Sequence, residues 1–263
     1  MDNPEKILTM GVDIGSTASK CLILEDGKKI ISTFLDPYGA GTSGPKRAME
    51  SALTRCGLEM EQISYMLATG YGRNTIESAN YQMSELSCHS MGAHLLFPTV
   101  QTVIDIGGQD IKVLRIGATG ILENFVMNEK CAAGTGRFLE VMAKILEVEI
   151  DDMARLSAES TERVDISSTC TVFAESEVIS QLSKKKDKRD IICGIHRSVA
   201  VRVAGLVKRI GVLPPVVLTG GVARNSGVLL ALQDELGVEI QTSPYAQYAG
   251  ALGAACFAYQ RNI

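Results

Sequence analysis

The sequence lacks an excess of positive charge. Its 263 residues contain 26 Lys and Arg against 30 Asp and Glu, and the formal net charge is -4. A protein that binds nucleic acid without sequence specificity needs a basic surface that neutralises phosphates. The composition therefore argues against a nucleic-acid partner.

Long apolar runs are also missing, and we expect no leader peptide. A bilayer-spanning helix needs about 20 consecutive apolar residues, and no such run occurs. Residues 1–6 are polar and lead directly into a strand pattern, unlike a secretory leader. We expect a cytoplasmic protein that makes no membrane contact.

The seven cysteines lack the close spacing of a C-x-x-C metal knuckle. Their number is odd and their spacing is wide, so a disulfide framework is not expected in a reducing compartment. Five of them lie in apolar periodic segments or lack neighbouring ligands, and we interpret these as small buried side chains. They are Cys21, Cys56, Cys88, Cys193 and Cys256.

The P-loop pattern G-x-x-x-x-G-K-[ST] is absent, which excludes that class of nucleotide-binding protein. Instead the chain repeats a strand, an Asp-Ile-Gly turn and two further strands. The expected strands are 7–13, 19–24 and 29–35 in the first copy, and 101–106, 111–116 and 121–126 in the second. This self-similarity indicates two halves of like fold.

Helices are predicted between the strands where apolar residues recur at helical spacing. The expected helices are 44–57, 75–94, 135–148, 171–183, 189–211, one from about 225, and 247–260; one more strand is 216–219. The pattern predicts an α/β fold with two halves around a cleft. We place the first half at 1–95, completed by 245–263, and the second at 96–244.

The first Gly turn has the composition of a phosphate site. Glycine lets the backbone approach phosphate oxygens closely, and hydroxyl and amino groups nearby can donate to them. Asp13 at the strand end suits a water-mediated Mg²⁺ contact. The candidate nucleotide ligands here are Ser16, Thr17, Ala18, Ser19 and Lys20. An ordinary glycine hairpin is the alternative for this motif taken alone.

Two further glycine turns follow in the second half. Asp105 precedes Gly107 and Gly108, and the strand at 216–219 ends in Gly220 and Gly221 before a helix begins. A helix N-terminus favours anionic oxygens. In order along the chain, these three motifs resemble the phosphate 1, phosphate 2 and adenosine motifs of the actin, sugar kinase and heat-shock chaperone (ASKHA) superfamily. The resemblance implies two ribonuclease-H-like halves and bound ATP or ADP with Mg²⁺.

Gln109 in the second motif favours hydrolysis over phosphoryl transfer to a sugar. A glutamine can orient an attacking water, and no sugar-recognition segment is evident. Asp13, Asp105 and Gln109 are therefore the candidate catalytic residues. A small-molecule kinase of the same fold remains the alternative.

Two cysteines lie in segments of a different kind. Cys131 is in N-E-K-C-A-A-G-T-G-R and Cys170 is in S-S-T-C-T-V-F-A-E-S-E, each just before a predicted helix. Helix N-termini stabilise thiolates and anionic clusters. A [4Fe–4S] cluster takes four thiolates, so a two-fold homodimer would supply two from each chain. The alternative is that Cys131 and Cys170 are core cysteines near helix N-termini and bind no cluster.

Within the ASKHA pattern, these cysteine segments resemble the activator components of 2-hydroxyacyl-CoA dehydratases, closest to the 2-hydroxyglutaryl-CoA type, from Met10 to Tyr259. The broader family includes ATPase subunits of benzoyl-CoA reductase, a second alternative. The resemblance implies a homodimer that bridges one oxygen-sensitive [4Fe–4S] cluster through Cys131 and Cys170. It also implies an electron from ferredoxin or flavodoxin, a dehydratase partner, and Gln247 near the nucleotide.

Overall fold

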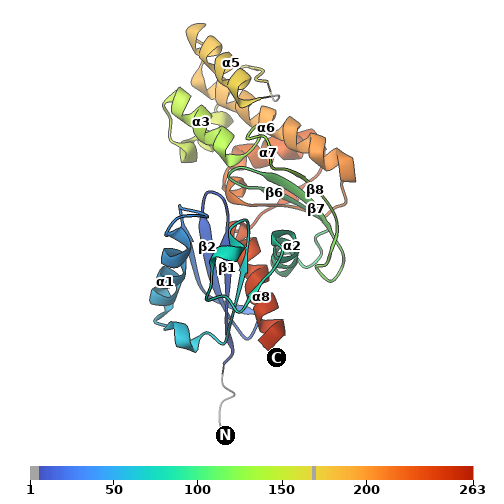
Figure 1. Ribbon diagram of the computed structural model, residues 1–263. Coiled ribbons are helices and arrows are strands. Elements are labelled where there is room, and N and C mark those ends of the chain that lie inside the picture. The colour runs from blue at the N-terminus through green and yellow to red at the C-terminus, as the bar shows by residue number, and fades with distance from the viewer. Residues whose placement is uncertain (1–5, 168–169, 263) are drawn as a thin grey trace. The chain divides into compact units, whose positions relative to one another are not determined.

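The computed structural model describes residues 6–167 and 170–262. The chain divides into two compact units, each built on a five-stranded mixed sheet with helices (Figure 1). Unit 1 comprises Met1–Val100, Ile116–Glu123 and Tyr245–Ile263, and unit 2 comprises Gln101–Arg115 and Asn124–Pro244. The predicted α/β fold class is confirmed.

The sheet of unit 1 contains β1 (Leu8–Ile14), β2 (Ser19–Glu25), β3 (Lys29–Asp36), β4 (Tyr65–Thr69) and β5 (Tyr81–Gln82). Their order is β3-β2-β1-β4-β5. The first three strands form an antiparallel meander, and β4 then pairs parallel to β1. Three α-helices belong to this unit: α1 (Gly44–Cys56), α2 (Glu85–Leu96) and α8 (Ala249–Asn262). Short 3-10 turns are η1 (Met60–Gln62), η2 (Arg73–Thr75) and η5 (Ala246–Tyr248).

Alternation along β1 and β2 decides which helix covers which face of this sheet. Met10, Val12 and Ile23 point to one side and pack with α1. Leu22 and Leu24 point to the other side and pack with α8. Side chains of neighbouring strand residues point to opposite faces, so an apolar run in β1 and β2 supplies two cores. The β1–β2 pair is therefore buried between helices from opposite ends of the chain.

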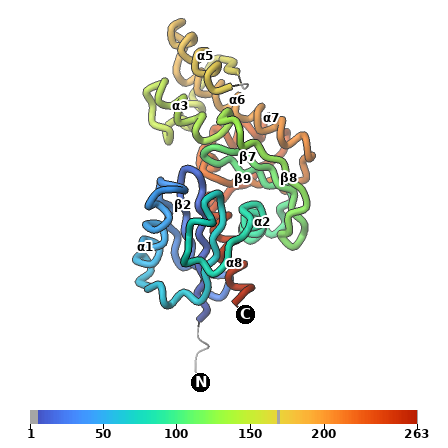
Figure 2. The backbone as a smooth tube through the Cα atoms, viewed as in Figure 1, coloured from blue at the N-terminus to red at the C-terminus, as the bar shows by residue number. Residues whose placement is uncertain are grey.

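Unit 2 contains β6 (Thr102–Ile106), β7 (Ile111–Ile116), β8 (Leu122–Asn128), β9 (Val216–Thr219) and β10 (Ile240–Gln241). Their order is β10-β9-β6-β7-β8, with β6 antiparallel to β7 and parallel to β9. Its helices are α3 (Gly136–Leu146), α4 (Met153–Ala158), α5 (Thr171–Ser183), α6 (Lys188–Ile210) and α7 (Ser226–Leu236), with 3-10 turns η3 (Ile150–Asp152) and η4 (Gly221–Arg224). The chain between β8 and β9 contains α3, α5 and α6, which lie next to one another (Figure 2).

Most expected elements appear within a few residues of their predicted bounds. The helix expected over 75–94 is wrong in its first half, where the chain forms β5 and loops before α2 begins at Glu85. β4, β10 and α4 were not predicted. No helix among the described residues has the length and apolarity that a bilayer crossing needs.

Candidate functional site

The β1–β2 hairpin positions the first candidate phosphate turn. The Gly15 amide donates to the Ala18 carbonyl, which closes the turn, and the Gly15 carbonyl accepts from the Ala40 amide. Ser16 is exposed at the tip. Ser19 is buried, and its hydroxyl donates to the Tyr38 carbonyl at 2.8 Å. The turn is thus held by backbone hydrogen bonds, while Ser19 uses its hydroxyl to fix the following loop.

Asp13 lies at the end of β1, directly opposite Lys20 in the β1–β2 register. Lys20 Nζ is 3.5 Å from Asp13 Oδ2. Asp13 is only 7% exposed, and its Oδ1 has no hydrogen-bond partner among the described residues. A Cβ added at Gly70 would lie 2.5 Å from Oδ1, and one at Gly250 would lie 2.9 Å from Oδ2. Glycine at both positions therefore makes room for this carboxylate.

The β6–β7 hairpin has the same construction in unit 2. Asp105 faces Lys112 in the register, and Lys112 Nζ lies 3.5 Å from Asp105 Oδ2 and 2.7 Å from Asp110 Oδ2. The Gly107 amide closes the turn onto the Asp110 carbonyl at 3.0 Å. Gln109 is exposed at the tip of the turn. Sequence reasoning missed Lys112, although it follows Asp105 by the seven residues that separate Lys20 from Asp13.

The third glycine turn follows β9. Gly220 has φ 82°, a conformation that favours glycine, and a Cβ there would lie 2.4 Å from the Ile106 carbonyl oxygen. The Thr219 hydroxyl donates to Asp105 Oδ1 at 3.2 Å. The Asn225 side chain caps α7 by accepting from the Val228 amide. Unit 2 therefore brings Asp105, Gly107, Gly108, Gly220 and Gly221 to one edge of its sheet, at the ends of β6 and β9.

Gln247 belongs to unit 1. It is partly buried in η5, which leads directly into α8, and Gly250 in the first turn of α8 packs against Asp13. The first residue of α8 follows the last residue of β1 by 235 positions (249 − 14), so only the tertiary structure brings the start of α8 to the end of β1.

The two candidate cluster cysteines are free and partly exposed. Cys131 lies in the loop between β8 and α3, and its carbonyl accepts from the Asn128 side chain at 3.1 Å. Cys170 is the N-cap residue of α5, as its position in the sequence predicted. Residues 168–169, which precede it in the S-S-T-C segment, lie outside the described residues. Cys170 therefore lies at a helix N-terminus, where negative charge is stabilised, and Cys131 precedes the first residue of α3 by five positions in the chain.

The first turn of α3 is bonded to the second phosphate turn. The amides of Gly136 and Arg137 donate to the carbonyls of Gly107 and Gly108 at 2.9 and 2.8 Å. Thr135, the N-cap residue, donates from its hydroxyl to the Ala132 carbonyl. The loop that carries Cys131 is therefore joined by short hydrogen bonds to the turn that carries Gln109, within one unit.

The remaining cysteines differ in environment. Cys21, Cys88 and Cys256 are buried, and Cys56 and Cys193 are partly buried. Burial raises the pKa of Cys21 and Cys256, and it raises the pKa of Cys88 to about 12. These three thiols stay protonated at neutral pH, which fits the prediction of structural roles. Among the described residues, no three His, Cys, Asp or Glu side chains of one chain are grouped to hold a metal ion.

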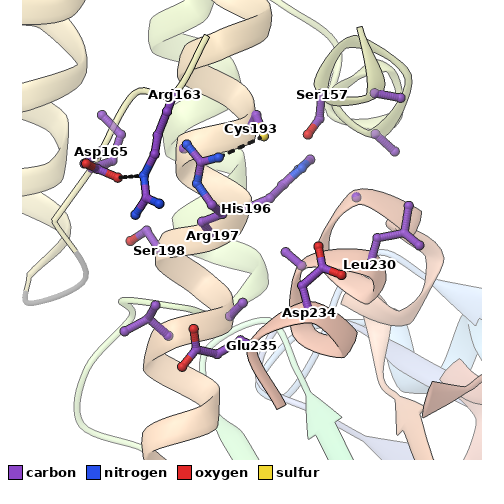
Figure 3. A pocket seen from close by; sticks show the side chains of 18 of the residues that line it. Ser157, Arg163, Asp165, Cys193, His196, Arg197, Ser198, Leu230, Asp234 and Glu235 are labelled. Atoms are coloured by element: carbon purple, nitrogen blue, oxygen red, sulfur yellow. Dashed lines mark hydrogen bonds and ion pairs between the residues drawn. The ribbon is translucent and has the colours of Figure 1, made fainter. Parts of the chain in front are cut away.

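A groove of about 690 Å³ lies in unit 2 along α6, between α4 and α7 (Figure 3). His196 reaches into it from α6 and is 1% exposed; burial lowers its pKa to about 4. Because Asn225 Oδ1 accepts from an amide, Asn225 Nδ2 donates to His196 Nε2 at 3.3 Å, which places the imidazole hydrogen on Nδ1. Among the described residues, the lining includes none of the predicted site residues.

Comparison with known proteins shows which family the chain belongs to. The family model described as BadF/BadG/BcrA/BcrD ATPase matches residues 10–258, almost the whole chain. The chain belongs to this ATPase family. It therefore shares its fold with nucleotide-hydrolysing proteins, in agreement with the order of the three glycine turns.

Three known proteins are similar to this chain over nearly their full lengths. The (R)-2-hydroxyglutaryl-CoA dehydratase activating ATPase of Acidaminococcus fermentans is 62% identical, covering 97% of this chain and 98% of the relative. The activator of lactoyl-CoA dehydratase of Anaerotignum propionicum is 52% identical, covering 96% and 97%. The activator of the 2-hydroxyisocaproyl-CoA dehydratase from Clostridium difficile, solved with bound ADPNP, superimposes with a TM-score of 0.95 at 52% identity, covering 97% and 96%.

Proposed function

We propose that this protein hydrolyses ATP to drive single electrons into a 2-hydroxyacyl-CoA dehydratase, acting in the cytoplasm as that enzyme's activator. The observation that carries the proposal is similarity to three activators over almost the whole chain. These three activators are named for three different acyl-CoA dehydratases, so we propose the class of the partner enzyme and not its acyl group.

Nucleotide binding is assigned to the glycine turns. The Ser16–Lys20 turn offers backbone amides, the hydroxyls of Ser16 and Thr17 and one amino group to phosphates, and Gly107–Gly108 let a phosphate approach the backbone closely. Gly220 and Gly221 allow the adenosine to approach the backbone, and Gln247 completes the candidate set. Gly220 has a positive φ, which favours glycine, and the missing side chain leaves room for the adenosine next to the backbone.

Mg²⁺ fits the carboxylates at the strand ends. Asp13 has a buried oxygen without a hydrogen-bond partner among the described residues, as expected for an oxygen that meets a hydrated cation. Mg²⁺ would neutralise charge on the phosphates during hydrolysis. Exposed Gln109 would orient the attacking water with its side-chain amide, and its exposure leaves that amide accessible.

A [4Fe–4S] cluster fits the two special cysteines. Both cysteines are partly exposed; Cys170 caps the N-terminus of α5, which stabilises the negative charge of a thiolate-ligated cluster, and Cys131 lies in the loop that leads into α3. One chain offers two such thiols, so a homodimer is proposed in which Cys131 and Cys170 of each subunit hold one cluster. The cluster would accept one electron from ferredoxin or flavodoxin and pass it to the dehydratase.

Coupling between the two sites is assigned to α3. Its first amides are bonded to the Gly107–Gly108 turn, and Cys131 lies in the loop just before it. A shift of that turn on nucleotide exchange would move the N-terminus of α3 and the Cys131 loop together. Coupling requires such a mechanical connection between two distinct sites.

The proposal is tested by anaerobic purification and reconstitution with iron and sulfide. The expected result is about four irons per dimer, with colour that fades in air, and ATP-dependent activation of a 2-hydroxyacyl-CoA dehydratase by the reduced protein. A colourless, iron-free protein whose ATP consumption depends on a sugar acceptor would contradict the proposal and favour the kinase. A purified chain that assembles only with other subunits would favour the ATPase subunit of a benzoyl-CoA-type reductase.

A further inference from the structure

The segment that leads to Cys170 lies along one face of α6. We call this segment, residues 160–167, the Cys170 strap. The α6 residues that contact the strap recur at the spacing of a single helical face. They are Asp190, Gly194, Arg197 and Ser198. Most of these contacts are made to backbone groups of the strap, so α6 fixes the path of the chain before Cys170.

Asp190 and Gly194 fix the first part of the strap. Asp190 is buried, and its Oδ1 accepts from the amides of Thr161 and Glu162 at 2.7 and 2.9 Å. One turn further along α6, a Cβ added at Gly194 would lie 2.3 Å from the Val164 carbonyl oxygen. Any larger residue at this position would therefore push the strap away from α6.

The end of the strap is bonded to two helices. The Arg197 guanidinium donates to the Val164 carbonyl at 2.9 Å, and the Ser198 hydroxyl donates to the Ser167 carbonyl at 2.9 Å. The Ser167 amide donates to Oε2 of Glu177, which belongs to α5, at 2.6 Å. Both backbone groups of Ser167 are therefore bonded, the carbonyl to α6 and the amide to α5.

The hydrogen bond between Ser167 and Glu177 closes a loop that contains Cys170. Cys170 follows Ser167 by three residues and precedes Glu177 by seven. Three residues of chain span at most about 11 Å, so the anchor at Ser167 limits the positions that Cys170 can take. Cys170 is also the N-cap residue of α5, the helix that carries Glu177. One carboxylate thus ties both sides of Cys170 together.

Resting on the proposed function, we infer that Glu177 is a positioning residue for Cys170, the proposed cluster ligand. Its carboxylate holds the strap against α5, while Ser198 holds the same residue of the strap against α6. A thiolate that is already in place loses little conformational entropy when a cluster binds. Groups that orient a ligand without touching the metal typically change metal affinity by about 10- to 100-fold.

Two substitutions separate the length of the Glu177 side chain from its charge. Glu177→Gln keeps the length and an oxygen that can accept from the Ser167 amide, whereas Glu177→Asp keeps the charge but is one methylene shorter. The full-length protein is reconstituted anaerobically, and iron release to bipyridyl is followed by absorbance. We expect Glu177→Asp to release iron about tenfold faster than the wild type, and Glu177→Gln to release it at nearly the wild-type rate. ADP affinity should be unchanged in both variants.

Glu175→Asp is the matched control. Glu175 lies two positions earlier on α5, and side chains two apart on a helix do not face each other. The substitution has the same cost in helix propensity, so the control should release iron at the wild-type rate. The inference is overturned if Glu177→Asp releases iron no faster than this control. It is also overturned if Glu177→Gln releases iron as fast as Glu177→Asp, because the effect would then come from the charge.

Alkylation reports the position of Cys170 without a cluster. In the iron-free protein, the rate at which iodoacetamide modifies Cys170 is expected to rise in Glu177→Asp, while the rate at Cys131 stays the same. Peptide mass spectrometry measures both rates, and equal rates at Cys170 in Glu177→Asp and the wild type would overturn the inference. A wild-type protein that holds no iron would instead overturn the proposed cluster, while the alkylation rates still show whether Glu177 positions Cys170.

Discussion

Lys20 and Asp13 face each other across the β1–β2 pair, with Lys20 Nζ 3.5 Å from Asp13 Oδ2. Lys112 stands in the same relation to Asp105 in unit 2, at the same distance. A nearby positive charge offsets part of the cost of burying a carboxylate. The repeat has therefore kept one Asp–Lys pair at the end of each central hairpin, where the candidate phosphate turns begin.

Replacing Cys131 by serine tests the proposed cluster. Serine keeps the size of the side chain but is a poor ligand for iron, so Cys131→Ser is expected to abolish stably bound iron and dehydratase activation. ADP binding should remain, because Cys131 is not among the candidate nucleotide residues. Iron content and calorimetric ADP affinity measure the two effects.

The matched control for that variant is Cys193→Ser. Cys193 is also partly buried in unit 2, but it lies on α6 and lines the groove of Figure 3. It should retain iron and activation. Full iron content in Cys131→Ser, or equal loss in both variants, would argue against the assignment of Cys131.

Gln109→Ala tests the orientation of the attacking water. The side chain is exposed, so we expect no change in melting temperature and little change in ADP affinity. The rate of ATP hydrolysis should fall by roughly 100-fold if the amide positions the water. Steady-state phosphate release measures it, and an unchanged rate would remove Gln109 from the mechanism.

Gly220→Ala tests the backbone of the adenosine turn. The new Cβ would lie 2.4 Å from the Ile106 carbonyl oxygen, at a φ of 82°. We expect a loss of about 2–4 kcal/mol in the free energy of unfolding, from the clash and the strained backbone together. Nucleotide affinity should fall as well, since the turn has to move.

Gly237→Ala is the control that separates clash from strain. Gly237 also has a positive φ, 65°, but a Cβ there would meet no atom within 4 Å. Its cost should be only about 1 kcal/mol, from backbone conformation alone. Denaturant unfolding measures both variants, and equal losses would show that the close approach at Gly220 is unimportant.

The lowered pKa of His196 predicts that the stability of the protein depends on pH. Burial lowers its pKa to about 4, below the ordinary value of 6.5, so the folded protein binds this proton less readily than the unfolded chain. The resulting stability is present above pH 6.5 and is lost as pH falls toward 4. From pH 7 to pH 5 the loss attributable to this residue is about 2 kcal/mol.

The control variant for this effect is His196→Gln, which keeps a side chain that can accept from Asn225. Its stability should fall less than that of the wild type over the same pH interval, whatever its stability at pH 7. Unfolding curves at several pH values provide the measurement. Parallel losses in both proteins would show that other groups cause the acid sensitivity.

Local sequence patterns were enough to predict the strands of the two repeated hairpins, the three glycine turns and the placement of Cys170 at a helix start. These features depend on local pattern: β1 and β6 are short apolar runs that end in Asp-Ile-Gly, and the helix around Phe138 has one apolar face. The prediction from local sequence failed before Glu85, where the chain forms β5 in place of a helix. β5 pairs with β4, a partner that lies outside the local pattern. A two-residue strand has no pattern of its own.

The differences between Asp13 and Asp105 arise from tertiary packing and could not be predicted from local sequence. The direction of the Thr69 and Thr219 hydroxyls, the burial of Lys112 between two carboxylates and the approach of Gly250 to Asp13 all join segments distant in the chain. Spacing shows that Asp13 and Asp105 are equivalent, because backbone pairing follows the repeat. Their partners are set by packing of side chains from other elements, and no local pattern records that packing.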